Sequence, residues 1–413
     1  AQIEQTGQFR LLSDIELPLA LVLAKMELAG FSVDKAGIEE YGKALSVRID
    51  ELEKAVWQEV GYEFNLNSPK QLGVALFESL GLPCRKKTKS GYSTGAEVLE
   101  DLRSIHPAVD HLLQYRTLAK LKSTYCDGLL SQVADDGRIH STLNQTETRT
   151  GRISSSEPNL QNIPVRRPEG REMRKLFRAK AGYVLCDADY SQIELRVLAH
   201  IANDSNMINA FKNGIDIHTL TASQVFGVPV EGVTPTMRSR AKAVNFGIVY
   251  GIGAFSLAKD IGVTRKEAAA YIDGYLATYP EVDKYMHRVV EQAKEDGFAS
   301  TMFGRRRLLP ELKTSNAMLR AFGERVARNM PIQGTAADII KIAMIRVNDR
   351  LEKELPDARL IMQVHDELIV EAPRDQAEKA CRILKEEMEG AVSLSVPLSV
   401  DAHFGDTWYD AKG

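Results

Sequence analysis

The stretch "YVLCDADYSQIELR" at residues 183–196 carries an apolar run directly into acidic residues. Residues 183–186 have the composition of a buried strand, and Asp187, Asp189 and Glu194 follow closely. A carboxylate beside a core is costly unless a positive group or hydrogen-bond donors meet it. The three carboxylates are therefore either solvated at the end of a strand or gathered around a cation. A second source of carboxylates elsewhere in the chain would favour the cation.

The stretch "RLIMQVHDELIVEAP" at residues 359–373 supplies that second source. Its two alternating apolar runs predict a tight β-hairpin, with His365 and Asp366 at the tip and Glu367 beside them. If this hairpin and the 183–190 strand are neighbours in one sheet, Asp189 and Asp366 meet at one edge. Paired carboxylates repel each other, and a hard divalent cation relieves that repulsion. Ordinary turn aspartates are the alternative, but the shared strand-to-acid layout favours a metal site.

The composition limits the class of protein. A chain of 413 residues is too long for one core, so we expect two or three subdomains. With 44% hydrophobic and 26% charged residues it has a globular composition, and it has no apolar run long enough to cross a membrane. The four cysteines are scattered without CxxC pairs, which disfavours a disulfide framework or a zinc site and favours a reducing cytosol. The first residue is Ala and no signal peptide follows, so the numbering begins inside a longer product or after processing.

The charge of the chain is unevenly distributed. The net charge is −3, yet three basic runs occur: "CRKKTKSG" at 84–91, "RRPEGREMRKLFRAK" at 166–180 and "GRRR" at 304–307. Any one run alone is typical of solvated surface. Three runs in an acidic protein indicate basic surfaces for a polyanion.

The pattern along the chain predicts an α+β fold with helices at both ends of a long axis and a small antiparallel sheet between them. Residues 34–133 have the pattern of a protruding, antiparallel helical subdomain, and residues 200–318 are mostly helical. Within the first segment, Ser68 is a candidate helix cap and Pro69 fits the first helical position.

Two polar stripes follow helical spacing. Arg238, Lys242, Phe246 and Tyr250 recur every four residues and share one slowly turning helix face. A guanidinium, an ammonium and two aromatic rings on one face suit a triphosphate, a sugar and a base. The aromatic residues alone would equally suit core packing, but the basic residues on the same face argue against a pure core role.

The second stripe consists of Arg325, Asn329 and Gln333. Long polar donors on one face fit contacts to minor-groove acceptors that do not depend on sequence, and an exposed polar face is the alternative. Pro331 is expected to kink or divide this helix.

Several motifs resemble those of the family A DNA polymerases, the bacterial DNA polymerase I group. They are "DYSQIELR", the stripe from Arg238 to Tyr250, "QGTAADIIK", "QVHDE" and "TGRISSSEPNLQNIP", and the resemblance covers nearly the whole chain. It implies a right-hand architecture with palm, fingers and thumb. The implied parts are an N-terminal segment on the palm (1–33), thumb (34–133), palm (134–194), fingers (195–318) and palm again (319–413).

The resemblance also implies an activity. This activity is template-directed DNA synthesis by a two-metal mechanism, in which deoxynucleotides are added to a primer 3′ end and pyrophosphate is released. The implied partners are primer-template DNA and deoxynucleoside triphosphates, with no membrane, for a monomer that serves replication and repair in the bacterial cytoplasm. Only the polymerase module is expected here, so the chain should not proofread. The short stretch between the thumb helices leaves no room for the processivity insertion of some phage relatives.

The same resemblance assigns the residues of the reaction centre. Asp189 and Asp366 are implied to hold two Mg²⁺ ions, with help from the Tyr190 carbonyl, and Glu367 lies beside them. Lys242 is implied to be the general acid for the leaving pyrophosphate. Asp187 matches no catalytic position of the family.

Further residues are implied to contact the substrates. Glu194 should lie under the sugar and exclude a 2′-hydroxyl, Phe246 should pack on the sugar, and Tyr250 should stack at the template position. The implied nucleotide-binding residues are Arg238, Lys242, Phe246, Tyr250, Gln192, Glu194 and His218. The implied DNA-binding residues are Arg152, Arg166, Arg325, Asn329, Gln333, His365 and Lys120.

Two other functions remain as alternatives. A single-subunit RNA polymerase has a similar palm, but a ribonucleotide enzyme needs space where the Glu194 carboxylate would lie. A non-catalytic DNA-binding relative is the second alternative, and the presence of Asp189, Asp366 and Lys242 opposes it.

Overall fold

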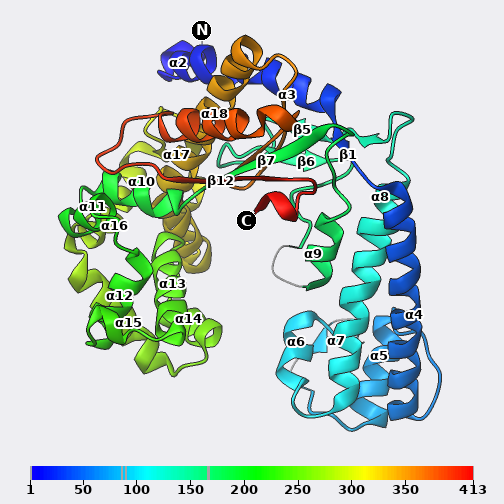
Figure 1. The fold of residues 1–413 in the computed structure, drawn as a ribbon. Helices are drawn as coiled ribbons and strands as arrows, with labels where there is room; N and C mark the ends of the chain where they lie inside the picture. The colour runs from blue at the N-terminus through cyan, green and yellow to red at the C-terminus, as the bar shows by residue number, and fades with distance from the viewer. Residues whose placement is uncertain (1, 85–86, 89–90, 165–167, 413) are drawn as a thin grey trace.

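A computed structural model describes residues 2–84, 87–88, 91–164 and 168–412. Two helical lobes hang from a body that contains the main sheet (Figure 1). This arrangement confirms the predicted α+β fold, in which a small antiparallel sheet lies between helical regions.

The main sheet has four antiparallel strands in the order β10-β11-β7-β12. Their bounds are β7 Tyr183–Tyr190, β10 Arg359–Val364, β11 Glu367–Pro373 and β12 Val400–Gly405. The predicted strand and hairpin are therefore confirmed, and they are neighbours. In the register between β7 and β11, Asp189 lies opposite Glu367.

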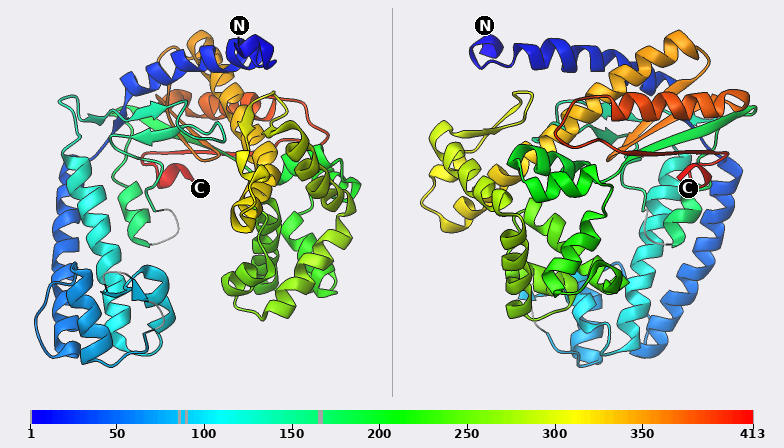
Figure 2. Two further views of the ribbon diagram at one scale, coloured as in Figure 1. Left: turned by 180° about the vertical axis from the view of Figure 1, so that it is seen from behind. Right: turned by 60° about the vertical axis from the view of Figure 1, so that its left-hand side comes forward.

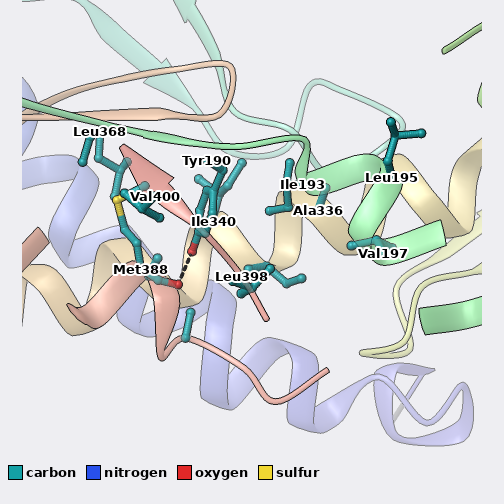
Figure 3. Packing of buried hydrophobic residues seen from close by; sticks show 14 of the residues in the cluster. Tyr190, Ile193, Leu195, Val197, Ala336, Ile340, Leu368, Met388, Leu398 and Val400 are labelled. Carbon is teal, nitrogen blue, oxygen red and sulfur yellow. Dashed lines mark hydrogen bonds between the residues drawn. The ribbon is translucent and has the colours of Figure 1, made fainter. Parts of the chain in front are cut away.

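One face of this sheet packs on α17 (Ala317–Glu354) and α18 (Ala377–Glu389). Alternate β7 side chains such as Cys186, Ala188 and Tyr190 enter this core, because successive residues of a strand point to opposite faces. The Tyr190 hydroxyl donates a hydrogen bond to the Met388 carbonyl at 2.6 Å (Figure 3).

The first lobe is an antiparallel helical unit with a core of its own, which includes Val56, Leu72, Leu99 and Leu112. Its helices are α4 Lys35–Val60, α5 Pro69–Val74, η2 Ala75–Ser79, α6 Ala96–Leu102, α7 Pro107–Lys120, η3 Leu121–Asp127 and α8 Gly128–Leu130. The predicted cap is confirmed, since the Ser68 side chain accepts from the Gln71 amide.

The second lobe is formed by helices after β7. Its elements are α10 Ile193–Ala202, α11 Ser205–Lys212, α12 Ile217–Phe226, η4 Val230–Gly232, α13 Pro235–Val249, α14 Ala254–Ile261, α15 Arg265–Thr278, α16 Pro280–Asp296, β8 Phe298–Ser300, β9 Arg306–Leu308 and η5 Pro310–Lys313. The two lobes descend on opposite sides of the body in the left-hand view of Figure 2. An ion pair joins them: Lys259 of α14 donates to Glu97 of α6, and both side chains are exposed.

The remaining elements complete the body. They are α1 Gln2–Gln5, α2 Phe9–Leu11, η1 Leu12–Glu16, α3 Leu17–Ala29, β1 Phe31–Ser32, β2 Lys87–Thr88, β3 Gly91–Tyr92, β4 Arg138–Ile139, β5 Thr142–Asn144, β6 Ser154–Ser156, α9 Pro168–Arg174, η6 Arg374–Gln376 and η7 Asp410–Lys412. Among the described residues, no helix has the length and apolar character needed to traverse a bilayer.

Pro331 was predicted to kink or divide its helix, and the predicted division is wrong. Helix α17 runs through Pro331 without a break over 38 residues. Proline removes one backbone hydrogen bond and crowds the preceding turn. Pro331 and its neighbours Met330 and Ile332 are all buried, so packing on both sides offsets that loss.

We predict that Leu384→Ala lowers the free energy of unfolding by about 2–5 kcal/mol, because it leaves a cavity between α18 and the sheet. Leu384 is fully buried, whereas Leu28 is 80% exposed. Urea unfolding should show the loss for Leu384→Ala and almost none for the matched control Leu28→Ala. Equal stability of the two variants would contradict this packing.

Candidate active site

The carboxylates predicted from the two sequence stretches lie at the same end of adjacent strands. Asp189 is near the end of β7, and Asp366 lies in the two-residue turn between β10 and β11. The amide of Tyr190 donates to the Asp366 carbonyl at 3.1 Å, which ties the turn to the strand. Because β7 and β11 are the two central strands, the acids meet at the end of the sheet, not at its side edge.

The surroundings of these acids favour a cation. Burial, reinforced by the charges of Glu194 and Asp189, raises the pKa of Asp366 to about 7. Burial also raises the pKa of Asp189, although Lys412 opposes this effect. Carboxylates that lose solvation beside like charges gain from a divalent ion.

The donors also suit a hard metal ion. Two carboxylates and main-chain carbonyls are oxygen ligands of the kind that Mg²⁺ prefers. The buried side chain of Tyr190 is bonded to Met388, so only its main-chain oxygen could contribute. Within the described ranges, no set of three or more His, Cys, Asp or Glu side chains is grouped for a metal. The pair Asp189 and Asp366 therefore leaves several positions on an ion for water or substrate oxygens.

Glu367 lies opposite Asp189 on the same face of the sheet and is buried among other polar groups. Its Oε1 accepts from the Trp408 indole at 2.7 Å, and its Oε2 accepts from Lys412. Lys412 also reaches Asp189 Oδ2 at 3.1 Å. Burial and a hydrogen bond with Glu367 raise the pKa of the neighbouring Asp187 well above its ordinary value.

The α13 stripe lies on the solvent side of the second lobe, with Arg238, Lys242 and Tyr250 exposed and Phe246 half-buried. Arg238 is held by Asp216, whose Oδ2 accepts from its Nε at 2.6 Å. Burial opposes ionisation of Asp216, but bonds from Arg238 and Thr219 outweigh it and lower its pKa to about 2. Asp216 thus remains charged and orients the guanidinium.

His218 lies behind this stripe and is buried. Its ring centroid is 5.8 Å from that of Phe246, and the Asn245 amide donates to its Nδ1 at 2.8 Å. Burial lowers the pKa of His218 to about 4; the charge of Asp216 opposes this, and the charges of Arg238 and Lys242 reinforce it. The imidazole is therefore neutral, with its proton on Nε2.

Glu194 is buried at the start of α10 and held from two sides. Arg152 Nη2 donates to Oε1 at 2.7 Å, and the Tyr250 hydroxyl donates to Oε2 at 3.0 Å. Burial and the Glu194 charge raise the pKa of Tyr250 to about 12, so this phenol remains a donor. Gln192 caps the helix with a left-handed backbone, φ 56°.

A cavity of about 820 Å³ brings together residues from all three parts of the molecule. Asp189 and His365 line it from the sheet, Lys242 from the second lobe and Lys120 from the first lobe. His365 is exposed, and its left-handed backbone, φ 52°, makes the tight turn. The cavity has the size of a small-molecule site.

The α17 stripe is accessible: Arg325 is exposed, and Asn329 and Gln333 are half-buried. A smaller cavity of about 260 Å³ joins Arg152 and His365. Arg166, predicted to bind DNA, lies outside the described residues.

The sequence reasoning missed several groups of this site. Lys412, Trp408 and Arg174 surround Glu367, and Asn245 and Asp216 orient His218 and Arg238. Asn245 lies off the four-residue stripe of α13 and is buried, so the spacing gave no signal for it. No local pattern marks Lys412, because its partners are far away in sequence.

The chain belongs to DNA polymerase family A, whose family model matches residues 35–410. It is 52% identical over 413 residues to DNA polymerase I of Geobacillus stearothermophilus and 50% identical over 413 residues to that of Bacillus subtilis. These matches cover the whole of this chain but only 47% of each relative, so the chain spans about half their length.

A solved structure has the same fold. It is described as the POL domain of Pol1 from M. smegmatis in complex with DNA primer-template and dNTP. It matches with a TM-score of 0.95 at 43% identity, over all of this chain and 73% of the other. The architecture is therefore that of a polymerase palm, with helical fingers and thumb.

We predict that His218 destabilises the protein as the medium is acidified. The unfolded chain takes up a proton near pH 6.5, whereas the folded imidazole resists it until about pH 4, so stability is lost as pH falls between these values. The loss at pH 5 amounts to about 2 kcal/mol.

The variant His218→Gln has no titrating side chain at this position, so it lacks this source of acid destabilisation. Its free energy of unfolding in urea should fall less between pH 7 and pH 5 than that of the unmodified protein. His287→Gln, at an exposed site, is the control and should follow the unmodified protein. An identical acid loss in all three proteins would refute a neutral His218.

Proposed function

We propose that this chain is a DNA-directed DNA polymerase that adds deoxynucleotides to a primer 3′ end and releases pyrophosphate. One observation carries the proposal: Asp189, on the sheet, and Lys242, on α13, line the same cavity. The acidic end of the sheet, whose oxygens can bind a metal, thus lies across this cavity from a basic helix that can bind an anionic substrate. The POL domain that matches this fold was solved with primer-template and dNTP, which supports the same substrates here.

We propose Mg²⁺ as the metal, with two ions held by Asp189, Asp366 and the Tyr190 carbonyl. When bound, such ions activate the attacking hydroxyl and stabilise the attacking and leaving oxygens of an in-line displacement. Asp189 and Asp366 bind and orient through their oxygens. Glu367, engaged by Trp408 and Lys412, supports Asp189 from the opposite strand.

The proposed nucleotide site follows α13. Arg238 and Lys242 bind the phosphates, and Lys242 donates a proton to the leaving pyrophosphate. His218, held neutral by burial, donates from Nε2 as Asn245 occupies its other nitrogen. Phe246, beside His218, packs on the sugar.

The proposed DNA path lies between the lobes. Lys120 from the thumb and His365 from the palm line the main cavity, and Arg152, Arg325, Asn329 and Gln333 contact primer and template nearby. We retain the predicted domains: thumb 34–133, fingers 195–318, and a palm made of 134–194 and 319–413 with residues 1–33 packed on it. The bacterial cytoplasm and a monomeric state remain predictions.

A polymerase of ribonucleotides is the alternative that the structure disfavours. Glu194 is buried and held by Arg152 and Tyr250, so it cannot swing away to admit a larger sugar. Selectivity then comes from a clash with the wrong substrate.

We predict that Asp189→Ala or Asp366→Ala lowers the rate of primer extension by about 10³-fold or more, because each removes an oxygen ligand worth several kcal/mol in the transition state. DNA binding should persist, since other residues hold the phosphate backbone. Single-turnover extension with Mg²⁺ and a binding titration measure the two effects.

Asp375→Ala is the control for this experiment, since Asp375 is an exposed residue of η6, which follows the opposite end of β11 from Asp366. Extension by either variant at the unmodified rate would rule out the proposed centre.

We predict that Glu194→Ala admits ribonucleotides, because removal of the carboxylate opens space for a 2′-hydroxyl. The ratio of ribo- to deoxynucleotide kcat/KM should rise by about 100-fold. This ratio is the quantity to measure, since loss of the Arg152 and Tyr250 contacts slows normal synthesis as well. Glu378→Ala, an exposed position of α18, is the control. An unchanged ratio would remove Glu194 from the role of gate.

A further inference from the structure

One face of the sheet end carries three carboxylates. Asp187 and Asp189 are two residues apart on β7 and therefore point to the same face, and Glu367 lies opposite Asp189 on β11. Asp187 is 2% exposed and Glu367 is 4% exposed. The family resemblance assigned Asp187 no function, and one of its buried oxygens, Oδ2, has no hydrogen-bond partner in the part of the chain that the structure describes.

A single ammonium group meets all three carboxylates. Lys412 Nζ donates to Glu367 Oε2, lies 3.1 Å from Asp189 Oδ2 and lies 3.8 Å from Asp187 Oδ1. The side chain of Lys412 is itself largely buried, at 29% exposure. The side chains of Asp187 and Glu367 are 3% and 6% exposed, so water screens their attraction to the ammonium only weakly, whereas Asp189, at 43% exposure, is screened more.

The segment that carries Lys412 is firmly anchored. Trp408 and Ala411 are fully buried. Trp408 packs against the rings of Phe31 and Phe177, and its indole donates to Glu367 at 2.7 Å. The guanidinium of Arg174 stacks 4.2 Å from the Trp408 ring. The position of the ammonium is thus set by the core and not by a free tail.

The hydrogen bond from Lys412 occupies only one of the two oxygens of the Asp189 carboxylate. Lys412 engages Oδ2, and no hydrogen bond among the described residues is made to Oδ1. An ion-paired carboxylate that keeps one oxygen free is pre-oriented for a cation, much as outer partners orient the ligands of a metal.

We infer that Lys412 is a positioning residue of the reaction centre: its ammonium serves as an internal counter-cation that holds Asp189, Asp187 and Glu367 in place before any divalent ion arrives. This inference rests on the proposed polymerase function. It assigns a role in the reaction to Lys412, in the segment after β12, for which the family resemblance implied none.

The test compares Lys412→Met, which keeps the length of the side chain and removes its charge, with Lys412→Arg, which keeps the charge. Lys385→Met, at an exposed position of α18, is the matched control. The first readout is thermal unfolding in EDTA and in Ca²⁺, an ion that probes the site without the reaction. The second is kcat against KM for nucleotide incorporation with Mg²⁺.

In EDTA, Lys412→Met should melt roughly 5 °C lower than the unmodified protein, because the carboxylates lose their counter-cation. Ca²⁺ should restore most of this difference, since it replaces the missing charge, whereas it should shift the unmodified protein and Lys385→Met much less. Lys412→Arg should melt close to the unmodified protein in EDTA.

For Lys412→Met, kcat should fall on the order of 10- to 100-fold with little change in the nucleotide KM, because a misplaced ligand disturbs the reacting geometry. Lys412→Arg should recover part of this loss. A loss of stability that Ca²⁺ does not restore, with kcat unchanged, would show only an anchor for η7 and overturn the inference. The inference would also be overturned if Lys412→Met melted in EDTA at the same temperature as the unmodified protein. If the unmodified protein itself fails to extend primers, the proposed function fails, and the melting comparison still decides the role of Lys412.

Discussion

The antiparallel pairing of β7 with β11 is the constraint on which the site depends. In its register Asp189 lies opposite Glu367, and Asp366 lies in the turn just beyond. A slip of one residue would turn every side chain of β7 to the other face. The apolar residues Cys186, Ala188 and Tyr190 would then leave the core, so the packing on α17 and α18 fixes the position of the acids.

The same alternation separates two environments within one strand. Even-numbered residues of β7 enter a dry core, while Asp187 and Asp189 meet polar partners on the other face. Burial makes the charges of Asp187 and Asp189 unfavourable, and the strand register fixes where both side chains lie. The chain meets that cost with Lys412, and a divalent ion can meet it near Asp366.

Local patterns predicted the strands, the hairpin and the stripe on α13, since period-two and four-residue spacings report directly on exposed and buried faces. They did not predict that α17 continues through Pro331, where burial of Met330 and Ile332 offsets the lost backbone hydrogen bond. They could not reveal Lys412, whose partners Asp189 and Glu367 are 223 and 45 residues away. Nor could they show that Tyr250 and Arg152 meet on Glu194, because only the folded chain brings the three together.

The contact between the tips of the lobes has a consequence for how a long polymer enters. Lys259 and Glu97 close a loop of protein around the space between fingers and thumb. An exposed ion pair is weak and is screened by salt, so this clasp opens and re-forms readily. On the proposed function, a duplex can therefore be loaded sideways, without being threaded from a free end. Release from the middle of a long molecule is equally possible, and it becomes easier as ionic strength rises.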